Sequence, residues 1–593
     1  MFEGAEYAAV GNHEVDEGLP DFGAFLEQIG EAGLQETITP KTPIVYCSME
    51  FYDKEDNDIK GGGGLGILAA DTRRVAERLG IPLVVMTPFY PIESHQHLTG
   101  FNSTERHEYS PVDRLYKKLG EVAISTYHHP VVRLDKYDRQ LGSTRILTVT
   151  ERGFDELYPG GNSDDHRLYQ EVALGFGGYK ALKEAGLRPS FMQLNEAPTV
   201  FAAIAMLDDL CGEGVPFEDA FDEVRQKILY TNHTLVQAVE AEFEQYQFEQ
   251  MVMPNIVHEE VKEWVRGMLL QGSGSLKLSS LAVELSGMKN GVSELHACVS
   301  DFKDRHGNQV EFEAVTNGIS DKWILPEIAA LYRESGILDR FDLPTADYRD
   351  RLDNLDQTVI NGMKKLGRQH MKEVLSNRRN QYGETIDVPE DAIVFDFKRR
   401  FVGYKRPGMA FHDLARLADI LQKANGYLLL TGKPHPNDRN MKDELRHLLE
   451  TVDSNPILKE RVHYIQDYDE EVGRALAIGA DCAVNVPVVG LEACGTSWMK
   501  DIANFKLLIS TPDGGVADRS PDTYLEVSGD ETEALYARMT EAVVVIRDQE
   551  RNKEVVAKQL KEYMPIISGS RMMKSYLGLY ARSAAAASIK QAA

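Results

Sequence analysis

The feature that most constrains the fold is a strand, a glycine-rich loop, a helix and a second strand that follow one another near the N-terminus. An apolar run at residues 43–48 is followed by a polar loop, four glycines at residues 61–64, a helical pattern and a second apolar run at residues 81–86. Parallel strands need a crossover of this kind, usually through a helix. The pattern therefore predicts an α/β fold built on a parallel sheet.

The same alternation recurs along the chain and divides it into two parts. Further strand patterns occur at residues 145–149, 227–231 and 312–316, and then at residues 393–396, 426–430, 462–465 and 482–485. A long helical pattern over residues 356–380 and a linker at residues 385–389 separate the two groups. We predict an N-terminal α/β domain over residues 1–385, a C-terminal α/β domain over residues 386–550, and a C-terminal helical segment over residues 551–593 that packs back on the first domain. Two doubly wound, Rossmann-like domains facing a cleft would bind a ligand outside the carboxyl ends of their strands.

The composition argues against several classes of function. The chain has 65 basic and 93 acidic residues and a formal net charge of −28, which disfavours binding to nucleic acid or to an anionic membrane surface. Its five cysteines form no Cys-x-x-Cys pair, which favours a reducing compartment and provides no pattern for a zinc site. The N-terminus lacks the pattern of a signal peptide, and no run approaches about 18 apolar residues. We therefore expect a soluble cytoplasmic protein without a metal site.

Residues 492–500, Glu-Ala-Cys-Gly-Thr-Ser-Trp-Met-Lys, combine three kinds of chemistry in one short stretch. The carboxylate of Glu492 can accept hydrogen bonds from sugar hydroxyls, and the turn at residues 495–497 can present amides and hydroxyls to an oxyanion. Lys500 can form a Schiff base with a carbonyl cofactor. The same residues also suit a capped helix with a surface lysine, so the stretch alone leaves both interpretations open.

Two other segments are candidates for anion binding. The glycine run can bring backbone amides close to an anion at the start of a helix, but no acid follows that would hold a ribose, which disfavours a dinucleotide. Residues 398–406 carry five cations in nine positions, and Arg400 and Lys405 among them can neutralise a phosphoryl oxygen. A flexible surface turn and a solvated charged face are the structural alternatives for these two segments.

These pieces occur in the order found in the α-glucan phosphorylases, which act on glycogen, starch or maltodextrin, and the chain resembles a short member of that family. The matching segments span about residues 44–513 and include residues 46–51, 63–66, 68–71, 193–196, 231–234, 316–318, 399–401, 404–406 and 492–500. The resemblance implies the GT-B fold of retaining glycosyltransferases, with a C-terminal helix that crosses back to the first domain.

The resemblance also implies an activity: orthophosphate cleaves an α-1,4-glucan with retention and releases glucose 1-phosphate. Pyridoxal 5′-phosphate would be held as a Schiff base on Lys500, with its phosphate group taking part in the chemistry. By position, the family's catalytic residues are His233, Arg400, Lys405 and Glu492, and its cofactor-binding residues are Lys500, Thr496, Ser497 and Arg399. The substrate and phosphate contacts fall on Gly63, Gly64, Leu65, Asn195, Glu196, Gly495 and Asn504. A homodimer follows by analogy only.

The chain departs from the family pattern at several positions near the expected substrate pocket. Pro198 and Ser320 stand where short members carry histidines, and Trp498 stands where they carry a small residue or asparagine. Two alternatives therefore remain. One is a nucleotide-sugar-dependent GT-B glycosyltransferase without pyridoxal phosphate, in which Arg400 and Lys405 bind a diphosphate. The other is a catalytically silent carbohydrate-binding homologue.

Overall fold

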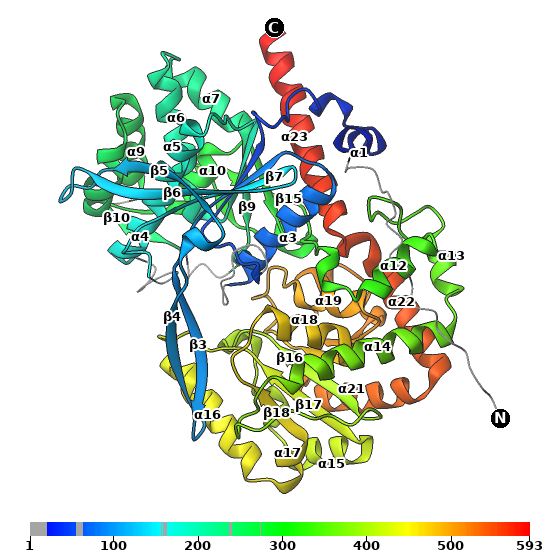
Figure 1. Cartoon of the computed structure of the whole chain (residues 1–593). Coiled ribbons are helices and arrows are strands. Elements are labelled where there is room, and N and C mark those ends of the chain that lie inside the picture. Colours follow the sequence, from blue (N-terminus) through cyan, green and yellow to red (C-terminus); the bar gives the residue numbers. More distant parts are fainter. Residues whose placement is uncertain are drawn as a thin grey trace.

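The computed structural model describes residues 21–54, 63–155, 157, 163–235, 240–272 and 274–592, with the side chains of residues 590–592 excepted. Two large sheets with helices packed on them form the upper and lower halves of Figure 1. Gly61 and Gly62 of the glycine run lie outside the described residues. Within the described part, no helix has the length and apolar character needed to cross a bilayer.

The upper sheet has nine strands, parallel at its centre. Their spatial order is β15 (Glu313–Ala314), β12 (Met288–Gly291), β9 (Ile228–Asn232), β8 (Phe191–Asn195), β1 (Ile44–Ser48), β2 (Leu83–Pro88), β7 (Thr144–Thr150), β6 (Val132–Leu141) and β5 (Lys117–Ile124). The strands from β15 to β7 run parallel, whereas β6 and β5 join the edge in antiparallel pairing. Every residue of β1, β8 and β9 is buried, as expected for parallel strands covered on both faces.

Side chains of the central strands alternate between two hydrophobic cores. Val45 and Cys47 of β1 pack on the face covered by α6 (Phe201–Gly212), whereas Ile44 and Tyr46 pack on the face covered by α3 (Gly64–Arg78) and α23 (Gly569–Ala592). This period of two places the helices on both faces of the sheet.

The lower sheet has six parallel strands. Their order is β18 (Val462–Ile465), β17 (Gly426–Thr431), β16 (Ile393–Lys398), β19 (Cys482–Asn485), β20 (Leu507–Ser510) and β21 (Leu525–Glu526). On one face, α14 (Gln357–Ser376) packs against α18 (Glu470–Gly479). The two helices meet at glycines: a Cβ on Gly479 would lie 2.3 Å from Met371 Cβ, and a Cβ on Gly367 would lie 2.5 Å from the Ile478 carbonyl oxygen.

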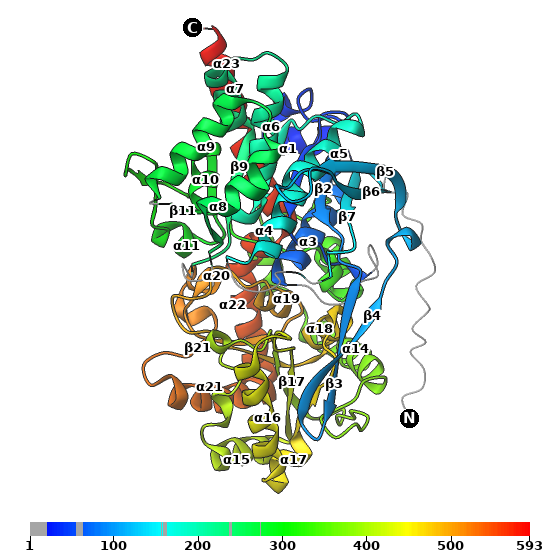
Figure 2. The same cartoon turned by 90° about the vertical axis from the view of Figure 1, so that its left-hand side faces the viewer.

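Two long elements join the halves. The C-terminal chain passes from α22 (Gln549–Ile567) to α23, the red helix that rises into the upper half in Figure 1. There the Tyr580 ring stacks on Phe191 of β8 with centroids 4.5 Å apart. On the other side, the hairpin of β3 (Ile92–Thr99) and β4 (Asn102–Tyr109) reaches down along the lower half (Figures 1 and 2), where the Leu98 amide donates to Gln466 Oε1 at 2.9 Å.

The strands and the long helix expected from the sequence are present, with ends shifted by a few residues. The mixed α/β architecture with two parallel-rich sheets is consistent with a GT-B-like fold. The β3–β4 hairpin was not predicted, because its residues are mostly polar and β4 is largely exposed.

Candidate active site

The predicted site residues lie where strands of both sheets end. Asn195 closes β8 and precedes Glu196, His233 follows β9, and Arg399 follows β16. Because these strands run parallel within each sheet, their carboxyl ends share one edge of it, where ligands bind in doubly wound folds. A hydrogen-bond contact joins the two halves here, since Ser293 Oγ donates to the Ala493 carbonyl oxygen at 2.8 Å.

A buried cluster of two cations and one carboxylate forms the centre of the lower side. Arg399 Nη2 lies 2.7 Å from Glu492 Oε2, and Lys405 Nζ donates to the same oxygen. Burial, followed by the charges of Arg399 and Arg400, holds the pKa of Lys405 well below its ordinary value. Burial likewise lowers the pKa of Arg399 to about 10. Positive charge is therefore crowded around one carboxylate, which favours binding of an additional anion.

The turn after Glu492 fits closely against this cluster. A Cβ on Gly495 would lie 2.6 Å from Arg399 Nη2, so that only glycine allows this approach. Thr496 precedes α19 (Ser497–Ala503) without a side-chain cap, and Thr496 and Ser497 are half-buried. Arg399 Nη1 is buried and has no hydrogen-bond partner among the described residues. An orphaned guanidinium nitrogen beside a tight glycine turn fits a bound phosphate group.

Lys500 is buried on α19 and lies against the Trp323 indole. Its Nζ is 3.1 Å from the centroid of the Trp323 ring. Burial lowers the pKa of the Lys500 amine to about 8, and the charge of Asp71 is the largest influence that opposes the shift. A buried amine that is partly neutral near pH 8 suits attachment of an aldehyde cofactor, so Lys500 fits pyridoxal phosphate and a surface lysine is excluded.

His233, Asn195 and Glu196 form a second cluster on the upper side. His233 Nε2 donates to Asn195 Oδ1 at 2.7 Å, and Glu196 Oε1 accepts from the His233 amide at 2.6 Å and from Thr234 Oγ1 at 2.8 Å. Burial lowers the pKa of His233 to about 3, so its imidazole is neutral at physiological pH. Glu196 has φ +79° and ψ 156°, a conformation that side chains rarely adopt and that must be held by the surrounding contacts.

The described part of the glycine loop lies against a carboxylate that the sequence did not single out. A Cβ on Gly63 would lie 2.5 Å from Glu50 Oε2, and the Gly66 amide donates to the same oxygen at 3.2 Å. Burial raises the pKa of Glu50, whereas the charge of Arg400 from the lower half lowers it. Gly63 at the start of α3 and the exposed Arg400 are thus brought to the same region, with Gly64 and Leu65 in the first turn of the helix.

The predicted site residue Asn504, and Trp498, which departs from the family pattern, both have structural partners. Asn504 Nδ2 donates to the carbonyl oxygens of Trp323 at 2.9 Å and Lys500 at 2.8 Å, and its Oδ1 accepts from the Leu325 amide at 2.8 Å. Its amide therefore braces the loop beside Lys500. The Trp498 ring packs edge-on against Tyr563 of α22, with centroids 5.1 Å apart.

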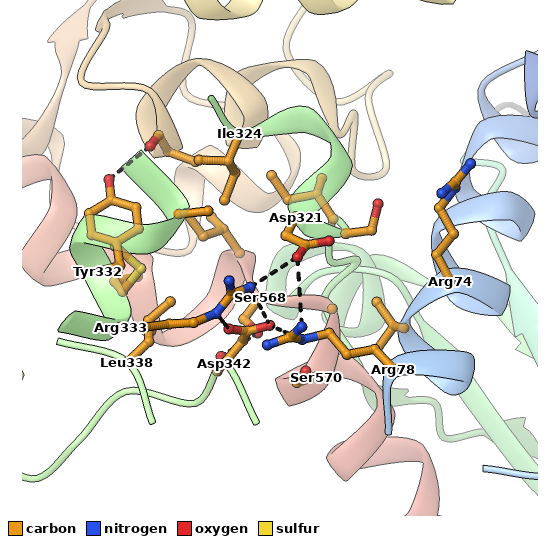
Figure 3. A pocket seen from close by; sticks show the side chains of 18 residues that line it. Arg74, Arg78, Asp321, Ile324, Tyr332, Arg333, Leu338, Asp342, Ser568 and Ser570 are labelled. Carbon is orange, nitrogen blue, oxygen red and sulfur yellow. Dashed lines mark hydrogen bonds and ion pairs between the residues drawn. The ribbon is translucent and has the colours of Figure 1, made fainter. Parts of the chain in front are cut away.

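A small cavity of about 40 Å³ behind α3 is too small for a sugar, since each water needs roughly 10–15 Å³ by this measure. Its polar wall is an ion-pair network in which Asp342 contacts Arg78 at 2.5 Å and Arg333 at 2.8 Å (Figure 3). We interpret it as part of the contact between the halves. No group of three or more metal-binding side chains occurs among the residues that the structure describes.

Comparison with known proteins identifies the family. A family model described as carbohydrate phosphorylase matches residues 187–576, about two thirds of the chain. The chain belongs to the carbohydrate phosphorylase family. It is 27% identical to the maltodextrin phosphorylase of Thermococcus litoralis, over 92% of this chain and 71% of that protein. It is 25% identical to the glycogen phosphorylase of Aquifex aeolicus, over 91% and 86% of the two chains, and 27% identical to that of Mycobacterium bovis, over 94% and 72%.

Three residues near the candidate site of this carbohydrate phosphorylase were not predicted from the sequence: Glu50, Asp71 and Trp323. Glu50 and Asp71 belong to segments that match the family, and Trp323 follows the matching residues 316–318. Each is an acid or an aromatic residue close to a glycine motif, and this pattern was the one sequence feature that could have marked it as a candidate. Their partners come from distant parts of the chain, and spacing alone does not reveal them.

Proposed function

We propose that the chain is an α-glucan phosphorylase that uses orthophosphate to cleave α-1,4-linked glucan with retention and releases glucose 1-phosphate. The reaction takes place in a cleft between two doubly wound units of the GT-B type, with pyridoxal 5′-phosphate attached to Lys500. The observation that carries the proposal is the buried Arg399–Lys405–Glu492 cluster next to the Gly495 turn and the buried Lys500. Membership of the carbohydrate phosphorylase family supports the same reaction.

The chain's cations bind the phosphates. Arg400 and Lys405 bind orthophosphate together with the amides of Gly63, Gly64 and Leu65. Arg399, Thr496 and Ser497 bind the cofactor phosphate. When bound, the cofactor would supply a phosphate group able to give and take a proton beside orthophosphate as the glycosidic oxygen is protonated. Fixed cations lower the free energy of the charge that develops in this step.

The carboxylate and the imidazole bind the sugar. When orthophosphate binds to the cations in place of Glu492, the Glu492 carboxylate becomes free to accept hydrogen bonds from sugar hydroxyls. Because His233 is neutral and donates through Nε2 to Asn195, its Nδ1 is left as an acceptor for a sugar hydroxyl. Glu196 holds the His233 peptide in place through the amide that it accepts.

Borohydride reduction followed by peptide mapping tests the cofactor, and glucose 1-phosphate release from maltodextrin plus orthophosphate tests the reaction. We expect a pyridoxyl adduct on the peptide that contains Lys500, and its loss in Lys500→Ala. Lys423→Ala, which changes a lysine with 76% of its side chain exposed, should keep both adduct and activity. Absence of adduct and of product would exclude the proposal, and hydrolysis of a nucleotide-sugar donor by the same protein would favour the nucleotide-sugar alternative.

A cytoplasmic homodimer remains part of the proposal, and sedimentation tests the dimer.

A further inference from the structure

Asp71 and Lys500 approach the same indole from different halves of the molecule. Asp71 is buried in the middle of α3, and its Oδ1 accepts from Trp323 Nε1 at 2.8 Å and from Ser320 Oγ at 2.5 Å. Lys500 Nζ lies over the face of the same Trp323 ring. The carboxylate thus holds the edge of the indole, and the amine rests on its π face, an arrangement that stabilises a cation.

Charged groups from four elements face the Lys500 amine. Asp71 of α3, Glu470 of α18 and Asp501 of α19 favour its charged form, and Lys398 of β16 opposes it. Glu470 already contacts Lys322, and Asp501 contacts both Lys398 and Lys506. Asp71 forms no ion pair of its own among the described residues. Of the three acids, Asp71 is therefore the one whose negative charge is available to interact with the Lys500 amine.

Hydrogen bonds from neutral donors stabilise the charged form of Asp71. Burial raises the pKa of Asp71 to about 6, while Lys500, Ser320 and Trp323 each lower it. Near pH 7 the carboxylate is thus mostly charged while the amine still carries its proton. Ser320 stands where the family pattern led us to expect histidine, and in this chain its hydroxyl serves Asp71.

We propose that Asp71 is a positioning residue for Lys500: with Ser320 it fixes the Trp323 indole, and its negative charge keeps the Lys500 amine protonated over that ring near pH 7. This inference rests on the proposed role of Lys500. Because α3 belongs to the upper half and α19 to the lower half, correct packing of the two halves sets the surroundings of the amine.

Trace acetylation with acetic anhydride in cofactor-free protein tests the inference without relying on activity. The extent of labelling of the Lys500 peptide is measured by mass spectrometry from pH 6 to pH 10. Asp71→Asn keeps an oxygen that accepts from Trp323 but removes the charge. We therefore expect the midpoint, the pH at which labelling of the Lys500 peptide is half-maximal, to fall by about one pH unit or more. Labelling at pH 7 should then rise roughly fivefold, because a larger fraction of the amine is neutral.

Two further variants complete the experiment. Ser320→Ala should lower the midpoint in the same direction but by less, because loss of the hydroxyl leaves Asp71 protonated over a wider pH range. Glu77→Gln removes a carboxylate from the same helix, where Glu77 pairs with Arg73, and should leave the midpoint unchanged.

Trp323 emission, isolated by difference from Trp323→Phe, should be retained in Asp71→Asn and altered in Asp71→Ala.

The outcomes separate the two proposals. A pyridoxyl adduct on Lys500 with the same acetylation midpoint in wild type and Asp71→Asn would overturn the role of Asp71 and leave the proposed function intact. No adduct, but a lowered midpoint in Asp71→Asn, would refute the cofactor assignment and retain the pairing. If Asp71→Asn fails to fold, an unchanged midpoint in Ser320→Ala would overturn the inference, and a lowered one would support it.

Discussion

At the scale of single residues, the site is dominated by charges that the protein neutralises internally. Glu492 is the common partner of Arg399 and Lys405, and all three are buried. A buried ion pair contributes little net stability, but removal of one partner leaves an uncompensated charge that is costly. Loss of Glu492 should therefore be costly, and in the proposed function orthophosphate replaces its carboxylate as the partner of the two cations.

Glu492→Gln should show this exchange directly. Removal of the carboxylate should destabilise the protein in phosphate-free buffer by about 3 kcal/mol, because two buried cations lose their partner. Orthophosphate should then raise the thermal midpoint of the variant by more than that of the wild type, as measured by calorimetry. Glu533→Gln, in an exposed pair with Arg416, is the control. An equal effect of orthophosphate on Glu492→Gln and wild type would contradict the shared-partner interpretation.

Lys500 should leave a signature in the pH dependence of stability of the cofactor-free protein. Its pKa is lowered to about 8 from the ordinary 10.5, so below pH 8 the amine is charged in both folded and unfolded states and the folded state carries the cost of burial. Between pH 8 and pH 10.5 the folded state loses this proton first, and the free energy of unfolding should rise by about 3 kcal/mol. In Lys500→Met this alkaline rise should be absent from denaturant curves. A rise that persists in the variant would assign it to another group.

At the scale of elements, close contacts between backbones position α18, which carries Glu470 toward Lys500. Helices α14 and α18 approach at Gly367 and Gly479, where a Cβ would overlap backbone or Cβ atoms. This contact holds α14 against the lower sheet, although α14 precedes the predicted domain boundary in the sequence. The boundary at residue 385 stays a prediction.

Gly479→Ala should destabilise the protein, because its Cβ would lie 2.3 Å from Met371 Cβ and 2.6 Å from the Gly367 carbonyl oxygen. Overpacking of this kind costs about 1–3 kcal/mol, which should appear as a lower thermal midpoint. Gly362→Ala on the exposed side of α14 meets no atom within 4 Å and should stabilise the helix by up to about 1 kcal/mol. If both variants shift the midpoint equally, the close helix contact is not responsible.

At the scale of the whole molecule, the halves are joined by elements distant in sequence. Helix α23 connects the end of the chain to β8, and the β3–β4 hairpin connects the upper half to the loop after β18. Since Lys500 and Asp71 come from different halves, we expect these connections to help hold the two sides of the site together.

Tyr580→Ala should loosen the C-terminal connection. The substitution removes the ring stacked on Phe191 and the hydroxyl that donates to Gln193 Oε1 at 3.2 Å. Truncation of a buried aromatic residue costs about 3–5 kcal/mol, and hydrogen exchange should accelerate throughout α23. Tyr109→Ala, at a side chain that is 65% exposed, should leave exchange in α23 unchanged. Unchanged exchange in Tyr580→Ala would show that the helix is held by other contacts.

Much of the fold could be read from local patterns. Buried parallel strands such as β1 and β17 are mostly apolar runs, and α14 has clear helical periodicity, so these elements were predicted from short windows. The β3–β4 hairpin has no such pattern. Its pairing is stabilised by contacts with the other half, including Gln96 with Asp467 and Lys442 with Glu105, and a short window cannot contain both partners.

The sequence by itself determined the α/β class, the family and the candidates for chemistry, because strand periodicity, glycine turns and the cations of residues 398–406 are properties of adjacent residues. Only the tertiary structure decided how those candidates are paired. It placed Glu492 on Arg399 and Lys405, Glu50 on the glycine loop, and Asp71 on the indole beneath Lys500. The physical reason is that burial and charge balance depend on groups that are not neighbours in sequence and meet only when the chain folds, and Asp71 and Lys500 meet only when the two halves pack together.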